Sequence, residues 1–191
     1  MSTSNMQPAE LPRSFEGRFT DFYRETRPTA LRFVQFRARG ADHEGILEES
    51  FLLVWKRLTA TGELSVGWFY QVLRNKIGDF YRSTGRTAIP VCTEDLPEVA
   101  SPYDLAHVVA QRADVRRVLS ELSTVHAEVL LLAYWCDLSG SEAARALGVS
   151  EGAFRARLVR ARRAFAEEYG VAGEGARTAH EGVLAWIASS D

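Results

Sequence analysis

Hydrophobic residues recur at helical spacing along most of this 191-residue chain, and no stretch of useful length alternates in the manner of a β-strand. Three such stretches open the chain: one from Phe15 toward Gly40, one over residues 42–58, and one over residues 66–82. In the second stretch the apolar positions form one stripe, while charged residues occupy the other side. This pattern is typical of amphipathic helices that pack together through their apolar faces.

Periodicity disappears over residues 83–103, which are rich in proline and carboxylates, and it resumes over residues 104–168. We therefore predict an all-α fold with two small helical domains, residues 14–82 and 104–168, joined by a flexible acidic linker. The polar residues 1–13 are predicted to be a disordered N-terminus. Residues 169–191 form a C-terminal tail of unknown role, with several glycines and one short apolar island.

The end of the second domain has the pattern of two helices joined by a tight turn. Ser139 and Glu142 fit a capping box at the start of the first helix, and Gly148 supplies a turn in which a positive φ costs little. Ser150 can cap the next helix. The inner face of that helix carries apolar residues at helical spacing: Phe154, Leu158, Ala161 and Phe165.

The remaining surface of this helix carries five arginines: Arg155, Arg157, Arg160, Arg162 and Arg163. Arginine grips phosphate and can read a guanine edge with two hydrogen bonds. Taken alone, the run is also compatible with an ordinary solvated face. Together with the small residues of the preceding helix, the glycine turn and the cap, it favours a DNA-binding helix-turn-helix that ends the second domain.

Composition restricts the function further. Hydrophobic residues make up 46% of the chain and charged residues 25%, which suits packed domains, while the formal net charge is −2. DNA binding must therefore rely on local basic patches, and strong binding is expected to need a partner. Two cysteines and four histidines are scattered without metal-ligand or redox spacing, so we expect no metal, no cofactor and no catalytic site. No membrane span or signal peptide is recognisable, and we expect a cytoplasmic protein.

The stretch over residues 66–82 interleaves aromatic and basic side chains. Rings can stack on unpaired bases while cations hold the phosphates, which would suit single-stranded nucleic acid. The alternative is that the aromatic residues belong to the core, as rings at helical spacing commonly do. The residues concerned are Trp68, Tyr70, Arg74, Asn75, Lys76, Tyr81 and Arg82.

In this order, the motifs resemble bacterial RNA polymerase sigma factors of the extracytoplasmic-function (ECF) group, in the sigma-70 family. The most specific match is the run from Ala143 and Ala144 through Leu147 and Gly148 to Leu158, which is similar to the fourth conserved region of the family. Residues 42–55 are similar to the polymerase-binding helix of the second region, and residues 68–75 to its promoter-melting segment. Gly45 and Glu48 depart from the usual pattern of that helix.

The resemblance implies a protein that binds core RNA polymerase, reads the minus-thirty-five element as duplex and captures the melted minus-ten strand. An anti-sigma partner is also plausible from the resemblance. The implied polymerase contacts are Glu44, Leu47, Glu48, Glu49, Phe51 and Trp55. The implied duplex contacts are Ser150, Glu151, Ala153, Phe154, Arg155, Arg157, Arg160, Arg162 and Arg163. The implied melted-strand contacts are Thr59, Thr61 and Ser65 in a loop, followed by Trp68, Tyr70, Arg74, Asn75, Lys76 and Arg82.

Two other classes of function compete with this interpretation. The first is a helix-turn-helix regulator that binds duplex DNA without polymerase, against which the net charge of −2 argues mildly. The second is an enzyme that uses a histidine or a cysteine, for which no residues converge. In-vitro transcription with core polymerase separates the first class from a sigma factor.

Overall fold

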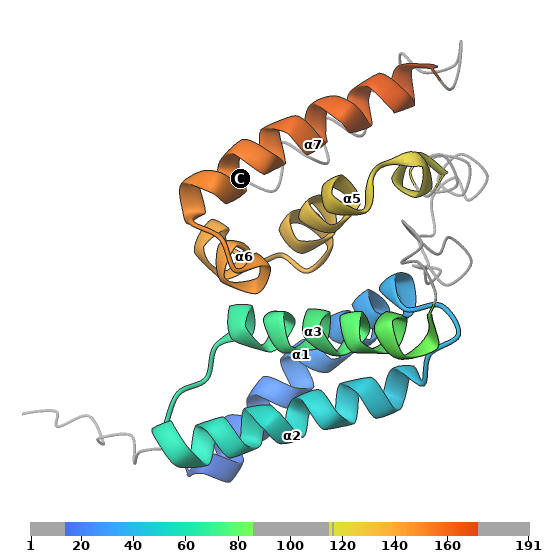
Figure 1. The fold of residues 1–191 in the computed structure, drawn as a ribbon. Coiled ribbons are helices and arrows are strands. Elements are labelled where there is room, and N and C mark those ends of the chain that lie inside the picture. Colours follow the sequence, from blue (N-terminus) through green and yellow to red (C-terminus); the bar gives the residue numbers. More distant parts are fainter. Residues whose placement is uncertain (1–13, 86–114, 116, 172–191) are drawn as a thin grey trace, which may run out of the picture.

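The computed structural model describes residues 14–85, 115 and 117–171, and every regular element among them is a helix (Figure 1). The predicted all-α fold is therefore confirmed. The predicted N-terminal segment, most of the predicted linker and nearly all of the C-terminal tail lie outside the described residues. The helices form two groups, which we call the first module (residues 14–85) and the second module (residues 115 and 117–171).

The first module contains α1 (Phe15–Arg37), α2 (His43–Thr61) and α3 (Val66–Thr84). Each helix begins after a residue whose side chain accepts a hydrogen bond from a backbone N–H of the first turn, which is the usual role of an N-cap. α1 runs through Pro28 as one continuous element. The three capping residues are Ser14, Asp42 and Ser65.

Aromatic rings fill the centre of this module. The rings of Phe51 and Phe69 lie 4.6 Å apart between their centroids, and Phe22 meets Phe69 edge to face at 5.6 Å. All three side chains are buried. Because each comes from a different helix, the cluster fixes α1, α2 and α3 relative to one another.

The second module contains α5 (Thr124–Leu130), the π-helix η1 (Leu131–Trp135), α6 (Gly140–Leu147) and α7 (Glu151–Val171), preceded by a helical turn at residues 117–121. The stretch from Thr124 to Trp135 changes from α to π geometry at Leu131.

The helix-turn-helix at residues 139–171 has the predicted local features. The capping box is formed by Ser139 and Glu142, and Gly148 adopts a φ of 66° at the turn. The Ser150 hydroxyl accepts a hydrogen bond from the N–H of Ala153 at 3.2 Å. These contacts are local in sequence, and they fix the angle at which α7 leaves the turn.

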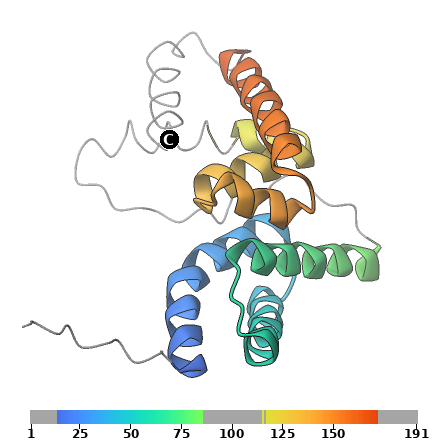
Figure 2. The ribbon, with the colours of Figure 1, turned by 90° about the vertical axis from the view of Figure 1, so that its left-hand side faces the viewer.

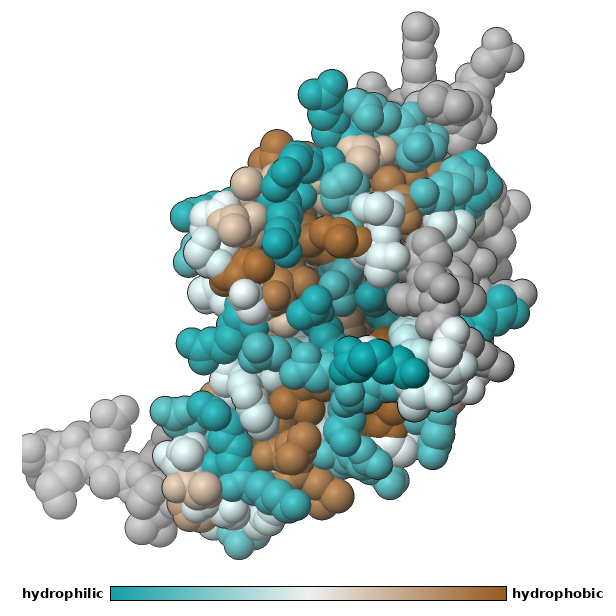
Figure 3. All heavy atoms as spheres, viewed as in Figure 1, coloured by the Kyte–Doolittle hydropathy of each residue, from teal (hydrophilic) through white to brown (hydrophobic). Residues whose placement is uncertain are grey.

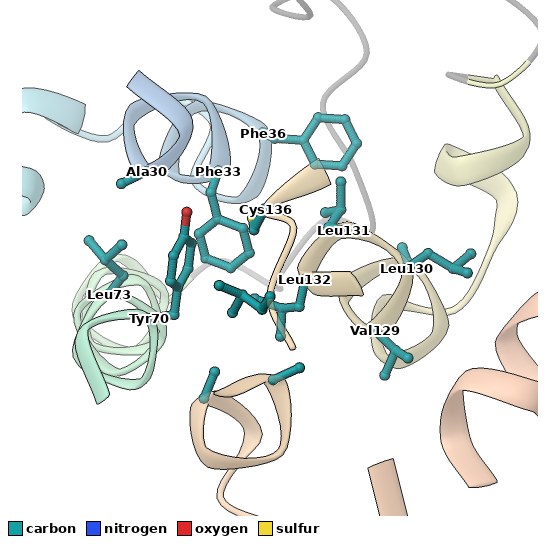
Figure 4. Packing of buried hydrophobic residues seen from close by; sticks show 14 of the residues in the cluster. Ala30, Phe33, Phe36, Tyr70, Leu73, Val129, Leu130, Leu131, Leu132 and Cys136 are labelled. Carbon is teal, nitrogen blue, oxygen red and sulfur yellow. The ribbon is translucent and has the colours of Figure 1, made fainter. Parts of the chain in front are cut away.

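The two modules pack against each other. α6 lies along α3 in both ribbon views (Figures 1 and 2). Figure 4 shows that Phe33 of α1 and Tyr70 of α3 face Leu132 and Cys136 of the second module. The buried residues of both modules belong to one hydrophobic cluster. The predicted pair of domains therefore shares a continuous core in this structure.

Candidate nucleic-acid interface

The outer face of α7 presents the basic surface of the helix-turn-helix. Arg155, Arg160 and Arg163 are exposed, whereas the opposite face packs into the second module. Two of these arginines have carboxylates one turn away: Arg155 lies 3.4 Å from Glu151, and Arg163 lies 2.8 Å from Glu167. Such exposed pairs are weak and yield readily to a phosphate. The chain thus offers cations on one face of a helix that begins at a tight turn.

Several other residues of the predicted duplex-binding set have different surroundings. Phe154 is buried, so in this structure it belongs to the core of the module and not to a groove-facing surface. Arg162 lies over the ring of Tyr134, 5.3 Å from its centroid, and also donates to the Tyr134 hydroxyl. Ala153 and Arg157 are half-buried. The exposed face is therefore narrower than the full run of arginines suggested.

Sequence reasoning missed Val159, whose relative exposure is 63%. Arg155 and Arg160 flank it on the same face, together with the exposed Ala156. The signal was available in the sequence, because Val159 is apolar and does not fall on the buried stripe of the helix. An exposed valine between arginines is suited to contact the methyl group of thymine in the major groove.

The predicted loop over residues 59–65 is shorter in the structure, because α2 extends to Thr61. The Thr59 hydroxyl donates to the carbonyl of Trp55 at 3.0 Å, and the Thr61 hydroxyl donates to that of Arg57 at 2.9 Å. Both hydroxyls are therefore engaged with their own helix. Ser65 is engaged as the N-cap of α3. The loop proper consists of residues 62–65.

Part of the predicted strand-binding surface of α3 remains accessible. Trp68 is half-buried, with the guanidinium of Arg57 4.9 Å from its ring centroid. Asn75 is exposed. Lys76 forms an ion pair with Glu49 of α2, and Arg82 forms one with Asp79. A base that stacks here would meet a ring that already holds one cation on its face.

Tyr70 is buried, and Arg74 is half-buried and bonded to the second module. The Tyr70 side chain is only 2% exposed, and burial beside Cys136 raises its pKa well above the usual value. Burial likewise raises the pKa of the Cys136 thiol to about 12. Arg74 donates to Glu128 of α5 and to the carbonyl of Ala146 in α6. In this structure both residues therefore contact the second module.

The predicted polymerase-binding residues of α2 divide between core and surface. Leu47 and Phe51 are buried in the aromatic core, so they hold the helix and do not offer a docking surface. Trp55 is half-buried, with its ring 5.2 Å from that of Phe19. Glu44, Glu48 and Glu49 are exposed: Glu44 pairs with Arg27 and Glu49 with Lys76.

Two further residues of α2 were missed by sequence reasoning. Leu52 is 58% exposed, and its neighbour Leu53 is exposed as well. They lie one turn after Glu48 and Glu49 on the outer face, which we call the outer α2 face (Glu48, Glu49, Leu52 and Leu53). On the view in Figure 3, hydrophobic patches lie on both modules and hydrophilic side chains separate them. Exposed apolar groups beside charged ones are typical of protein-binding surfaces.

Within residues 14–85 and 117–171, no group of three or more histidine, cysteine or acidic side chains is arranged to hold a metal ion. In the same part of the chain, no helix combines the length and apolar character needed to cross a membrane.

Comparison with known proteins defines the class of this molecule. Residues 112–165, which contain the helix-turn-helix, match the family described as Sigma-70, region 4. The ECF RNA polymerase sigma factor SigL of Mycobacterium tuberculosis is 30% identical over 139 residues, which cover 69% of this chain and 78% of SigL. The chain therefore belongs to the ECF sigma factor family, whose members act in transcription initiation.

Other relatives agree with this assignment. The ECF RNA polymerase sigma factor BldN of Streptomyces coelicolor is 28% identical over 158 residues, covering 78% of this chain and 58% of BldN. Among solved structures, CnrH in complex with the cytosolic domain of CnrY has a TM-score of 0.56 at 21% identity, covering 81% of this chain and 89% of CnrH. RpoE in complex with the anti-sigma factor NepR from Bartonella quintana has a TM-score of 0.56 at 22% identity, covering 81% of this chain and 99% of RpoE. These two structures share the fold of the chain.

Proposed function

We propose that this protein directs core RNA polymerase to promoters by reading the minus-thirty-five element as duplex with α7 and capturing the melted minus-ten strand with the first module. The observation that carries the proposal is the exposed arginine face of α7, presented by a helix-turn-helix. The protein acts in the cytoplasm on promoter DNA and has no chemistry of its own, since polymerase makes the RNA bonds.

Duplex reading is supported by charge and geometry. Arg155, Arg160 and Arg163 are exposed on one face, and α7 begins directly at the turn, as a helix that enters the major groove does. Because the net charge of the chain is −2, the residues outside this basic patch repel DNA and offset part of its attraction. Binding to DNA is therefore expected to be strong only when polymerase adds its own contacts.

Capture of the melted strand is supported by the accessible part of α3 and the loop that precedes it. Trp68 offers a partly exposed ring, Asn75 offers an exposed amide, and residues 62–65 offer backbone groups. Unpaired bases need such partners, because they lose stacking when the duplex opens. A base stacked on an aromatic ring is worth about 1–3 kcal/mol by alanine substitution.

Polymerase docking is assigned to the outer α2 face. Leu52 and Leu53 supply apolar area there, and Glu48 and Glu49 supply charge for a basic partner. A small apolar centre with a polar rim is the usual composition of a binding surface. An anti-sigma protein is a further proposed partner, because one of the similar solved chains is bound to such a protein.

The proposal is tested with holoenzyme on two promoter templates, one fully duplex and one with a pre-melted bubble at the minus-ten element. Arg155→Ala should weaken transcription from both templates by about 1–3 kcal/mol if the residue reads a base, with the defect tied to the minus-thirty-five sequence. Arg117→Ala, at an exposed position of the same module that pairs with Glu121, is the matched control. Trp68→Ala and Asn75→Ala should reduce transcription from the duplex template, and the pre-melted bubble should restore much of it.

The competing function, a regulator that works without polymerase, predicts a different result. Such a protein would bind duplex DNA tightly alone and would yield no promoter-specific transcript when core polymerase is added. Arg155→Ala would then weaken duplex binding, and the bubble would make no difference. That pattern would replace the proposed function.

A further inference from the structure

One face of α3 is covered by the second module. This face, which we call the junction face, consists of Gly67, Tyr70, Gln71 and Arg74. Tyr70 is buried against Cys136, and Arg74 reaches both α5 and α6. Two of these four residues, Tyr70 and Arg74, belong to the set expected to hold the melted strand. The same surface therefore has two candidate occupants, the second module and DNA.

The electrostatic centre of the junction is Glu128 of α5. Arg74 holds its carboxylate with a two-pronged contact, at 2.9 Å from Nε to Oε1 and 3.1 Å from Nη2 to Oε2. Arg37 of α1 approaches Oε1 at 3.4 Å. Glu128 and Arg37 are buried, so each needs the opposite charge across the junction. The Glu128 carboxylate thus occupies two of the N–H donors with which Arg74 could bind a phosphate.

The backbones of the two modules also approach closely at Gly67. A Cβ atom at this position would lie 2.5 Å from the carbonyl oxygen of Glu142 and 3.0 Å from its Cα. Neither atom can move without shifting α6 itself. Nearby, Arg145 donates to the Ser65 hydroxyl at 3.1 Å. The close packing at this end of α3 is therefore possible only because residue 67 is a glycine, which has no Cβ atom.

We propose that the junction is an autoinhibitory contact, in which the second module and the melted promoter strand compete for the junction face. The free chain is closed: Glu128 neutralises Arg74, and Tyr70 is buried against Cys136 of the second module. A strand gains access only when the modules separate, as they must if one is to read duplex while the other holds the melted element. This inference rests on the proposed function and names how its strand-binding surface is regulated.

The test uses two variants of the full-length chain that disturb the junction from opposite sides. Gly67→Ala places a methyl group against the backbone of α6, and Glu128→Gln removes the charge that pairs with Arg74. The matched control is Gly78→Ala on the same helix, where a new Cβ would meet only the far end of the Arg82 side chain at 3.3 Å. A third variant, Arg145→Ala, changes an exposed residue and removes the hydrogen bond to Ser65. It replaces either of the first two variants if that variant loses its helical circular dichroism signal.

Two properties of the free chain are measured: its radius of gyration by small-angle X-ray scattering, and its affinity for a fluorescent single-stranded oligonucleotide that carries the minus-ten sequence. The junction variants should expand and bind the oligonucleotide at least about tenfold more tightly, because apparent affinity scales with the fraction of open chain. Gly78→Ala should match the parent in both properties.

Two results would overturn the inference. Junction variants that keep the parent's dimensions and affinity would mean that these contacts do not close the chain. Variants that expand without binding the strand more tightly would mean that the two occupants do not compete. Failure of the proposed function is distinguished separately, because then the parent would give no promoter-specific transcripts with core polymerase, whatever its dimensions.

Discussion

Replacement of Val159 by alanine should weaken promoter binding without weakening the fold. The side chain is 63% exposed in the free chain, so its loss leaves no cavity. Full burial of a valine is worth about 1.5–3 kcal/mol, and roughly two-thirds of that remains available on binding DNA. Since alanine keeps the Cβ, the loss has an upper limit of about 1–2 kcal/mol, or roughly 5- to 30-fold in affinity.

The assay measures holoenzyme binding to promoter duplexes in which each thymine of the minus-thirty-five element is replaced in turn by uracil. Uracil removes only the methyl group that a valine would touch in the major groove. The parent should lose affinity at one thymine, and Val159→Ala should be indifferent to that same change. Val125→Ala serves as the control, because Val125 is also exposed, at 53%, but lies on α5. A Val159→Ala holoenzyme that binds like the parent and keeps every thymine preference would show that Val159 does not contact a thymine methyl group.

Two further predictions follow from the burial of individual side chains. Phe51→Ala should lower the free energy of unfolding by about 3–5 kcal/mol in urea titrations, whereas Leu52→Ala should change it by less than about 0.5 kcal/mol yet weaken binding to core polymerase. If Leu52→Ala lowered the stability more than Phe51→Ala and left polymerase binding unchanged, polymerase would not dock on the outer α2 face. Burial raises the pKa of Cys136 from 9.0 to about 12, so in a Cys92→Ser chain its alkylation at pH 8 should be about a thousandfold slower than that of a free thiol, from ionisation alone. Alkylation at the rate of an exposed cysteine would show that the junction is open.

The helix boundaries that the sequence predicted correctly depend on short-range contacts. Asp42, the Ser139–Glu142 capping box and Gly148 act within four residues of their partners, so their roles can be recognised from spacing alone. The end of α2 was wrong because Thr59 and Thr61 also suit a loop by composition. In the structure their hydroxyls bond to the preceding turn of the helix.

The junction between the modules could not be predicted. Glu128 meets Arg74 across 54 residues of sequence and Arg37 across 91, and no local pattern reports such contacts. For the same reason Tyr70 could be described only as a stacking residue or a core residue. Its environment depends on Cys136 of the second module, which lies far along the chain.

The sequence predicted the kinds of side chain at the candidate site better than it predicted which residues are exposed there. The arginines of α7 could be found because charge on a helix with an apolar stripe must face outward, and Arg155 does so. Phe154 and Phe51 were assigned to binding although their spacing marks them as core. Val159 and Leu52 were overlooked, although an apolar residue that lies off the buried stripe is a signal of a binding surface.

Transcription in vitro tests whether this sigma factor brings polymerase to promoters. Core polymerase is supplied with fragmented genomic DNA, with and without the protein, and the 5′ ends of the RNA are mapped. New start sites that require the protein should appear, each preceded by the same two spaced sequence elements. Start sites that are identical with and without the protein would contradict this role.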